Sequence, residues 1–287
     1  MKYGTMVLLA VTALVGFPVQ ALSDTVDLAT AGNFAVMGST QVTNTGTTNL
    51  NNGNLGLSPG TSYPVSGINY SGTFGALQDT GVGAAANARA DLTAAYSVAA
   101  GLAPTSTNDY TTFNSGDLNG LTLTPGVYFF SSTALLSVGG LLQLDFEGDA
   151  NALFVFQVGS ALTAVSGSEV RAIDFGSGTA AGCNVFWQVT SSAGIGTDAT
   201  FLGHILALSD ITLGHGAIVN GSALARNGQV TMDANTINNL ICGDDDDDDD
   251  GDGVAVVPLP SAAALGLGLL PLAWLARRRA VRRREAS

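Results

Sequence analysis

The chain has 287 residues, a formal net charge of −13 and only 11% charged residues. Much of the negative charge lies in one run, Asp244–Asp250, and most of the arginines follow Ala276, so the rest of the chain lacks the basic stripe that nucleic-acid-binding proteins carry. Its frequent and evenly spread apolar residues argue against intrinsic disorder.

The N-terminal stretch Met1–Ala21 has the features of a secretory signal peptide. A positive start is followed by an apolar core at Val7–Phe17 and a cleavage site at Val19–Ala21. A membrane anchor is the alternative, but the apolar run is short for a bilayer. Secretion in turn predicts a disulfide between Cys183 and Cys242 rather than two buried thiols.

Two blocks of the chain predict short strands separated by turns. In Ala31–Gly60, apolar residues alternate with polar ones, and Asn51–Asn54 is a turn signal. In Leu118–Val170, apolar or alternating segments are bounded by Gly, Pro or Asp. The segment Asn184–Val189 continues this pattern, and we expect its Trp187 to pack in the core.

Between these blocks, an Ala-rich stretch predicts one amphipathic helix over residues 79–100. Asp79 or Thr80 is a candidate N-cap, and Gly101 followed by Pro104 is typical of a helix C-terminus. We expect the narrow face of Ala and Leu to pack along the side of a sheet. A coiled coil is disfavoured because no heptad is sustained.

The stretch Gly194–Ile237 carries an internal repeat of about 18–19 residues, the scale of one supersecondary unit. Four small residues recur in two consecutive copies, namely Gly196, Ala199, Gly203 and Ala207, then Gly214, Ala217, Gly221 and Ala225. A looser third copy follows at Val230–Ile237. One copy cannot bury its own apolar face, whereas a stack of copies can, so the repeat predicts a parallel β-solenoid.

The C-terminal region begins with a predicted acidic linker, residues 244–256, because consecutive carboxylates repel one another and stay solvated. The motif Val257, Pro258, Leu259, Pro260 then precedes the apolar segment Ser261–Ala276 and two Arg clusters. This order resembles the VPLP type of bacterial PEP-CTERM sorting tails. The resemblance implies transient membrane insertion of a single apolar helix and cleavage near the motif by an exosortase-like protease. A permanent C-terminal anchor is the alternative.

The chain is therefore expected to comprise a signal peptide (1–21), a β-rich domain (22–243), the acidic linker (244–256) and a sorting or transmembrane tail (257–287).

The β-rich domain resembles the ice-binding-like family of bacteria and fungi, which has a discontinuous β-solenoid. The resemblance lies in segments that occur in the family's order: AGNFAVMGST, NGNLGLSPGTS, the Ala-rich helix, LTPGVYFF, ALFVFQVGS, CNVFWQV, FLGHILALSDITL and VNGSALARNGQVTMDANTI. It implies a mainly β fold, a right-handed parallel β-helix of roughly triangular section with one long α-helix packed alongside. It also implies adsorption of a flat solenoid face to ice.

The resemblance implies an ice-binding pattern of Thr, Ala or Gly, any residue, then Thr or Asn. Thr45–Thr48 matches it fully, Thr197–Thr200 has Asp at the small position, and Asp233–Thr236 keeps only the last residue. Threonine suits a flat face because a stiff χ1 holds one methyl and one hydroxyl, and a solenoid repeats such side chains about 4.8 Å apart. The predicted ice-binding residues are Thr45, Thr47, Thr48, Thr197, Thr200 and Thr236. The alternative is that they are ordinary exposed strand residues.

The sequence contains no recognisable catalytic or zinc-binding motif, and we predict no enzymatic activity, cofactor or metal. His204 and His215 lie on neighbouring predicted rungs at non-equivalent positions, which favours structural over metal-binding roles. Asp145, Glu147 and Asp149 could supply a carboxylate pair for glycoside chemistry, but an exposed strand edge alternates in the same way.

The sequence therefore predicts a secreted or surface-displayed, ice-binding protein whose partner is ice or ordered water. The alternative is a non-catalytic adhesive protein of the extracellular matrix that interacts with exopolysaccharide, because a sorting tail fits both.

Overall fold

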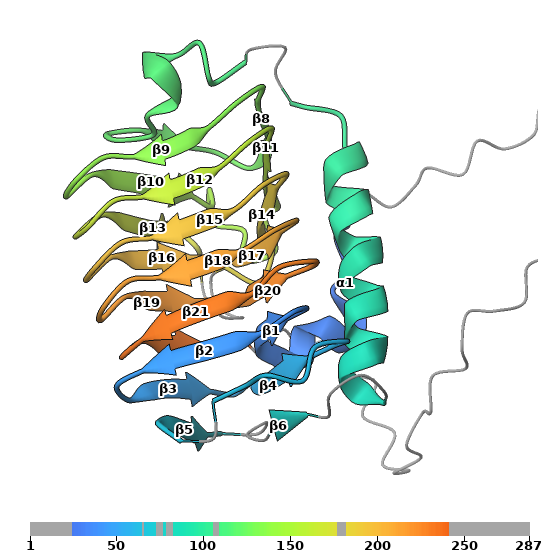
Figure 1. Cartoon of the computed structure of the whole chain (residues 1–287). Coiled ribbons are helices and arrows are strands. Elements are labelled where there is room, and N and C mark those ends of the chain that lie inside the picture. The colour runs from blue at the N-terminus through green and yellow to red at the C-terminus, as the bar shows by residue number, and fades with distance from the viewer. Residues whose placement is uncertain are drawn as a thin grey trace, which may run out of the picture. The chain divides into compact units, whose positions relative to one another are not determined.

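The computed structural model describes residues 25–64, 66–72, 77–78, 83–105, 109–176 and 182–240. These residues form three parallel β-sheets around a hydrophobic core, with one long helix beside them (Figure 1). The predicted mainly β solenoid with a flanking helix is confirmed. The signal peptide, Cys242, the acidic linker and the sorting tail lie outside the described residues. Within the part that is described, no helix has the length and hydrophobicity needed to cross a membrane.

We name each sheet by what lies on its outer side. The helix-side sheet contains, in spatial order, β6 (Leu77–Gln78), β4 (Asn54–Leu57), β1 (Phe34–Gly38), β20 (Ala223–Ala225), β17 (His204–Ala207), β14 (Val185–Val189), β11 (Phe154–Val158) and β8 (Gly126–Phe130). The threonine sheet contains β2 (Val42–Thr45), β21 (Val230–Asp233), β18 (Ile211–Leu213), β15 (Ala193–Ile195), β12 (Leu162–Ala164) and β9 (Ala134–Leu136). The amide sheet contains β5 (Ile68–Ser71), β3 (Thr48–Asn51), β22 (Thr236–Asn238), β19 (Ile218–Asn220), β16 (Thr200–Leu202), β13 (Glu169–Ile173), β10 (Leu141–Asp145) and β7 (Thr122–Leu123).

The chain visits the three sheets in turn, and one strand from each forms a rung, such as β17–β18–β19. The predicted repeat is confirmed, since β17 and β20 of successive rungs pair in parallel. Gly221 approaches Gly203 so closely that a Cβ on Gly221 would lie 2.1 Å from the Gly203 carbonyl oxygen. Only glycine fits there, which explains why this pair recurs in the sequence.

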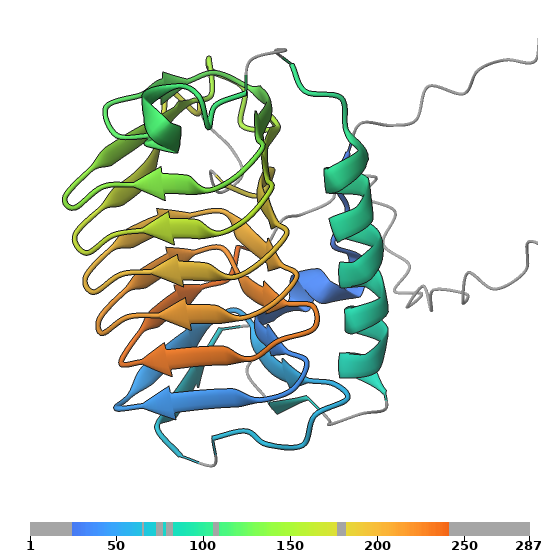
Figure 2. The same cartoon turned by 45° about the horizontal axis from the view of Figure 1, so that its top comes forward.

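The N-terminal rung is not at an end of the stack. The strands β1, β2 and β3 pair with β20, β21 and β22, the last three strands of the described chain. Figure 1 shows this seam where the blue strands lie against the orange ones, and Figure 2 shows the same order from another side. The chain then passes through α1 (Ala84–Gly101) to the far end of the stack and winds back toward the seam.

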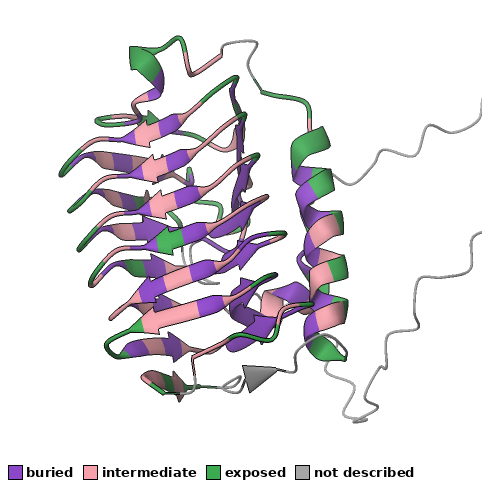
Figure 3. Cartoon of the chain, viewed as in Figure 1, coloured by how far each residue is buried: buried purple, intermediate pink, exposed green. Residues whose placement is uncertain are grey.

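The two kinds of sheet differ in burial (Figure 3). Strands β11 and β14 of the helix-side sheet are buried at every residue, because the core lies on one side and α1 lies on the other. Strands of the threonine and amide sheets alternate instead. Trp187 is fully buried, its ring stacks on Phe156 at 3.8 Å, and its Nε1 donates to the Leu202 carbonyl at 3.0 Å. The predicted core role of Trp187 is confirmed.

Helix α1 starts later than the predicted residue 79. Gly83 precedes it in a left-handed conformation with φ 80°, and the expected N-caps Asp79 and Thr80 lie outside the described residues. Its buried face is Ala85, Ala88, Leu92, Ala95, Tyr96 and Ala99. At its C-terminus, Gln157 Nε2 donates to the carbonyls of Ala99 and Leu102 at 2.8 Å each, which satisfies helix-end acceptors. Two short 3-10 helices, η1 (Ala29–Asn33) and η2 (Asn114–Gly116), complete the described elements.

Candidate functional site

A row of threonines runs down the outer side of the threonine sheet. Strand pairing places these residues at one position on successive rungs: Thr43, Thr231, Thr212, Gly194, Thr163 and Leu135. We call this set the threonine row. Neighbouring members lie about 4.8 Å apart along the stack, the spacing between hydrogen-bonded strands.

The threonine row faces outward because its neighbours in each strand face the core. In β18, for example, Thr212 is exposed whereas Ile211 and Leu213 are 0% and 1% exposed. The same alternation places Thr231 between the buried Val230 and Met232. At its four threonines the row therefore presents β-branched side chains, each fixed by a stiff χ1, on a rigid hydrogen-bonded support.

A second row follows the corner where the threonine sheet turns into the amide sheet. Backbone N–H groups donate along it from rung to rung, for example from Asp198 to the His215 carbonyl at 2.9 Å and from Ala234 to the Thr45 carbonyl at 2.8 Å. The members of this corner row are Val138, Ser166, Thr197, His215, Asp233 and Thr45. Thr45 and Asp233 are also direct strand partners.

The residue after each corner-row member adopts a left-handed backbone conformation. These residues are Gly139, Gly167, Asp198, Gly216, Ala234 and Gly46, with φ between 50° and 70°. The second position of the four-residue pattern is thus set by the turn of the backbone, which glycine enters at no steric cost and Asp tolerates. Asp198 is compatible with this turn for that reason.

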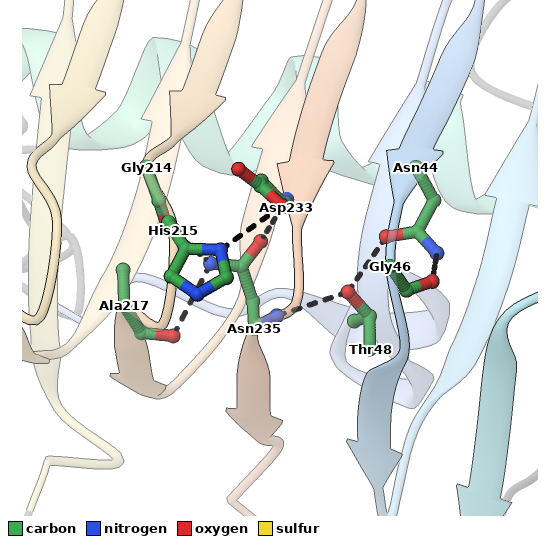
Figure 4. A network of polar contacts seen from close by, with 8 residues as sticks. All are labelled: Asn44, Gly46, Thr48, Gly214, His215, Ala217, Asp233 and Asn235. Carbon is green, nitrogen blue, oxygen red and sulfur yellow. Dashed lines mark hydrogen bonds and ion pairs between the residues drawn. The ribbon is translucent and has the colours of Figure 1, made fainter.

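The corner between β2 and β3 has one residue more than the others. Asn49, not Thr48, pairs with Thr236 of the neighbouring rung, so Thr48 moves into the buried position that Asn235 holds in that rung. Thr48 is 0% exposed; its Oγ1 donates to Asn44 Oδ1 at 2.7 Å and accepts from the Asn235 backbone N–H at 3.0 Å (Figure 4). Thr48 therefore closes the corner from inside and does not reach the surface.

The amide sheet carries a row of a different kind. Strand pairing aligns Ser71, Asn51, Asn238 and Asn220, and we call these four residues the amide row. Each side chain donates to the next: Ser71 Oγ to Asn51 Oδ1 at 2.6 Å, Asn51 Nδ2 to Asn238 Oδ1 at 2.7 Å, and Asn238 Nδ2 to Asn220 Oδ1 at 2.8 Å. The row ends at Leu202, which is 6% exposed.

Comparison with known proteins agrees with this architecture. The family model described as ice-binding-like matches residues 36–238. The chain belongs to the ice-binding-like family. It is 45% identical over 238 residues to an ice-binding protein of Nostoc sp. (strain HG1), covering 81% of each chain, and 30% identical over 223 residues to one of Colwellia sp., covering 74% of this chain and 83% of the relative.

Solved structures give the same result. The crystal structure of an ice-binding protein from an Antarctic biological consortium has a TM-score of 0.64 and 38% identity, with coverage of 81% of this chain and 95% of that one. The structure from the Antarctic ascomycete Antarctomyces psychrotrophicus has a TM-score of 0.65 and 30% identity, covering 76% and 100%. The predicted resemblance to the ice-binding-like family is confirmed.

The six threonines predicted from the family pattern do not share one face. Thr45 and Thr197 lie on the corner row and are exposed, as is Thr47 in the same corner as Thr45. Thr48 is buried. Thr200 and Thr236 lie on the outer side of the amide sheet, where strand pairing puts Ile218 between them.

The sequence interpretation missed the four threonines of the threonine row, Thr43, Thr163, Thr212 and Thr231. Each stands between two residues that point inward, as in Leu162–Ala164 or Ile211–Leu213. The signal was therefore a single threonine flanked by inward-facing residues just before each corner. The four-residue pattern drew attention to the corner itself instead.

The two histidines lie on one rung rather than on neighbouring rungs. His204 in β17 is buried, with Nδ1 2.8 Å from Ser222 Oγ, no hydrogen-bond partner for Nε2, and a pKa that burial lowers to about 4. His215 is exposed on the corner row, with Nδ1 3.2 Å from Asp233 Oδ1. Among the described residues, no three His, Cys, Asp or Glu side chains gather in a way that would hold a metal.

The acidic residues considered for glycoside chemistry have local partners. Asp145 Oδ1 accepts the Glu147 backbone N–H at 3.0 Å, and Asp149 Oδ1 accepts the Asn151 backbone N–H at 2.9 Å. Such contacts are typical of carboxylates that stabilise turns. The structure therefore gives the side chains of Asp145 and Asp149 a role in the turn after β10.

Proposed function

We propose that the chain binds ice, and that the contact surface consists of the threonine row and the adjacent corner row. Membership of the ice-binding-like family supports the function. The observation that carries the location is the repetition of Thr43, Thr231 and Thr212 on three successive rungs of a sheet that α1 does not cover.

The geometry of the two rows supports adsorption to a lattice. Corner-row residues Thr45 and Asp233 follow threonine-row residues Thr43 and Thr231 by two positions in the same strands. Side chains two apart on a strand lie about 6.6 Å apart and rungs lie about 4.8 Å apart, so the rows form a two-dimensional grid. A grid held by backbone hydrogen bonds is ordered before contact, and adsorption therefore has little conformational entropy to remove.

The surface is also poor in charge. The threonine row contains no ionisable side chain. The nearby carboxylate of Asp210, two residues before Thr212, already has a hydrogen-bond partner, because its Oδ1 accepts the Gln229 backbone N–H at 2.8 Å. Ice offers no counter-ion for a charge that it dehydrates, and dehydrating an unpaired charge is costly. The ionisable exceptions on the corner row are His215 and Asp233, whose Nδ1 and Oδ1 atoms lie 3.2 Å apart.

Recrystallisation of ice in the presence of the purified chain tests the function. We expect inhibition by the wild type and an increase of about tenfold in the required concentration for Thr212→Tyr, because the larger ring lifts the grid off the lattice. Ala94→Tyr on the exposed side of α1 is the matched control and should act like the wild type. A wild-type chain that leaves ice growth unchanged at high micromolar concentration would refute the function.

We further propose secretion through the signal peptide, a Cys183–Cys242 disulfide, and sorting through Val257–Pro260 to the cell surface or matrix. The burial of Cys183, which is 8% exposed, is compatible with a disulfide. Mass spectrometry of the extracellular chain, with and without reduction before alkylation, tests these proposals together. An intracellular chain with residue 1 intact would contradict the first of them.

A further inference from the structure

We propose that the amide row is a second binding surface, for a neutral polyhydroxylated polymer such as an extended β-linked glycan. It lies on the amide sheet, across the corner from the threonine row. The proposal does not depend on ice binding. It rests on the direction of the hydrogen bonds in the row, their unused capacity, the charge around them and their spacing.

The hydrogen bonds fix every amide in the same orientation. Asn51 donates to Asn238 and Asn238 donates to Asn220, so no amide can flip without breaking a bond within the row. The side chains of these three residues are half-buried. Their conformations are therefore set before a ligand arrives, which lowers the entropic cost of binding.

Each amide keeps unused hydrogen-bonding capacity. A primary amide has two N–H donors and a carbonyl oxygen with two lone pairs, and the row uses one donor and one lone pair of Asn238. Asn220 uses only its oxygen. A sugar hydroxyl both donates and accepts, so it complements the donor and the acceptor that remain on each rung.

The surroundings favour an uncharged ligand. Asn69 and Asn49 form a parallel amide contact at 3.0 Å beside the row, and Thr236 and Ile218 continue that line. The charged pair of Arg171 and Glu169 lies further along the sheet, beyond Leu202. A phosphate or carboxylate ligand would find no cation along the row, whereas hydroxyls need none.

The spacing suits a polymer that runs along the stack. Four successive rungs place the ends of the row about 14 Å apart at 4.7–4.9 Å per rung. An extended β-linked glycan advances by a similar length per sugar, so consecutive sugars meet consecutive amides. The row also lacks the methyl groups of the threonine row, which distinguishes it chemically from the proposed ice surface.

Nuclear magnetic resonance of the 15N-labelled chain with cellohexaose tests the proposal. We expect the side-chain amide signals of Asn51, Asn220 and Asn238 to shift in a saturable way, and anionic oligo-alginate of equal length to cause no shift. Asn238→Leu interrupts the row and should weaken the affinity for cellohexaose about tenfold or more. Thr231→Tyr, on the same rung but on the threonine sheet, should leave it unchanged.

The same variants separate this proposal from ice binding. Retained inhibition of ice recrystallisation by Asn238→Leu, together with lost glycan binding, supports two independent surfaces. Absence of shifts with millimolar cellohexaose overturns the proposal. Loss of ice activity in Asn238→Leu without glycan binding by the wild type also overturns it and assigns the amide row to ice. Asn220→Ala, which removes only the last member, gives the same comparison if Asn238→Leu does not fold.

Discussion

The threonine row and the amide row belong to one solenoid and have the same spacing, and both of their sheets carry outward-facing threonines, yet the two rows differ in chemistry. Thr231 and Thr236 belong to the same rung, the first in a line of methyls and hydroxyls, the second beside a chain of linked amides. The difference shows that the number of threonines in a segment does not define a face. The outward position of each strand does, because the solenoid repeats that position on every rung.

The corner between the two sheets also shows that residue type alone does not decide which side chains face solvent. The second position of the four-residue pattern has a left-handed backbone, as at Gly46 and Asp198, and in the corners without the extra residue the third position is buried, as at Ala199 and Ala217. Half of the pattern therefore reports how the chain turns. In the corner Thr197–Thr200 the fourth residue lies on the outer side of the amide sheet, whereas in the longer corner Thr45–Thr48 the third residue is exposed and the fourth is buried.

Acid should destabilise the core that supports both faces. His204 binds a proton with a pKa of about 4 when folded, against about 6.5 when unfolded, so its stabilising contribution is complete above pH 6.5 and is lost as pH falls through 4. The loss should reach about 3 kcal/mol. Thermal unfolding at pH 7.5, 5.5 and 4.5 measures it. His204→Phe should flatten this dependence, and an unchanged pH profile in that variant would contradict the assignment.

The buried and exposed threonines of one corner should differ in stability. Thr48→Val leaves the Asn235 backbone N–H without its acceptor and should cost about 1–3 kcal/mol of unfolding free energy. Thr45→Val, on the exposed side, should change it by less than about 0.5 kcal/mol. Urea unfolding of both variants measures the contrast. Equal costs would contradict the inward orientation of Thr48.

Bulky substitutions on the corner row should weaken ice binding less than Thr212→Tyr does, because the corner borders the grid. We expect Thr45→Tyr and Thr197→Tyr to raise the concentration needed for recrystallisation inhibition about fivefold. Thr200→Tyr on the amide sheet is the control and should have no effect on ice. A larger loss at Thr45 than at Thr212 would shift the contact surface toward the corner.

Removing the two ionisable side chains from the corner row should improve ice binding slightly. His215→Thr with Asp233→Thr extends the row of hydroxyls between Thr197 and Thr45 and removes a pair whose nitrogen and oxygen lie 3.2 Å apart. We expect inhibition at about half the wild-type concentration. The double variant should stay folded, because an exposed pair contributes little to the free energy of unfolding. Weaker inhibition by the double variant would mean that the pair contacts ice productively.

The repeating part of the fold could be predicted because it is local in sequence. Glycines such as Gly203 and Gly221 are required where rungs touch, and the Ala-rich stretch has few options besides a helix against a sheet. Both signals lie within one or two rungs. The helix start was placed too early, since Gly83 rather than a side-chain cap precedes Ala84.

The seam could not be predicted in the same way. Asn51 and Asn238 are 187 residues apart, and the residues around each of them give no local sign that the other lies beside it. The extra residue between Thr45 and Asn49 is equally invisible until Asn49 is paired with Thr236. A one-residue shift turns a side chain from the surface to the core, which is why Thr48 matched the pattern yet is buried.

Substitution of two threonines of one rung tests the central claim most directly. Thr231 and Thr236 are both half-buried and outward-facing, on the threonine sheet and the amide sheet respectively. Measured by thermal hysteresis, Thr231→Tyr should lose most of the activity while Thr236→Tyr keeps that of the wild type. Equal losses, or a loss confined to Thr236→Tyr, would contradict the assignment of ice binding to the threonine row.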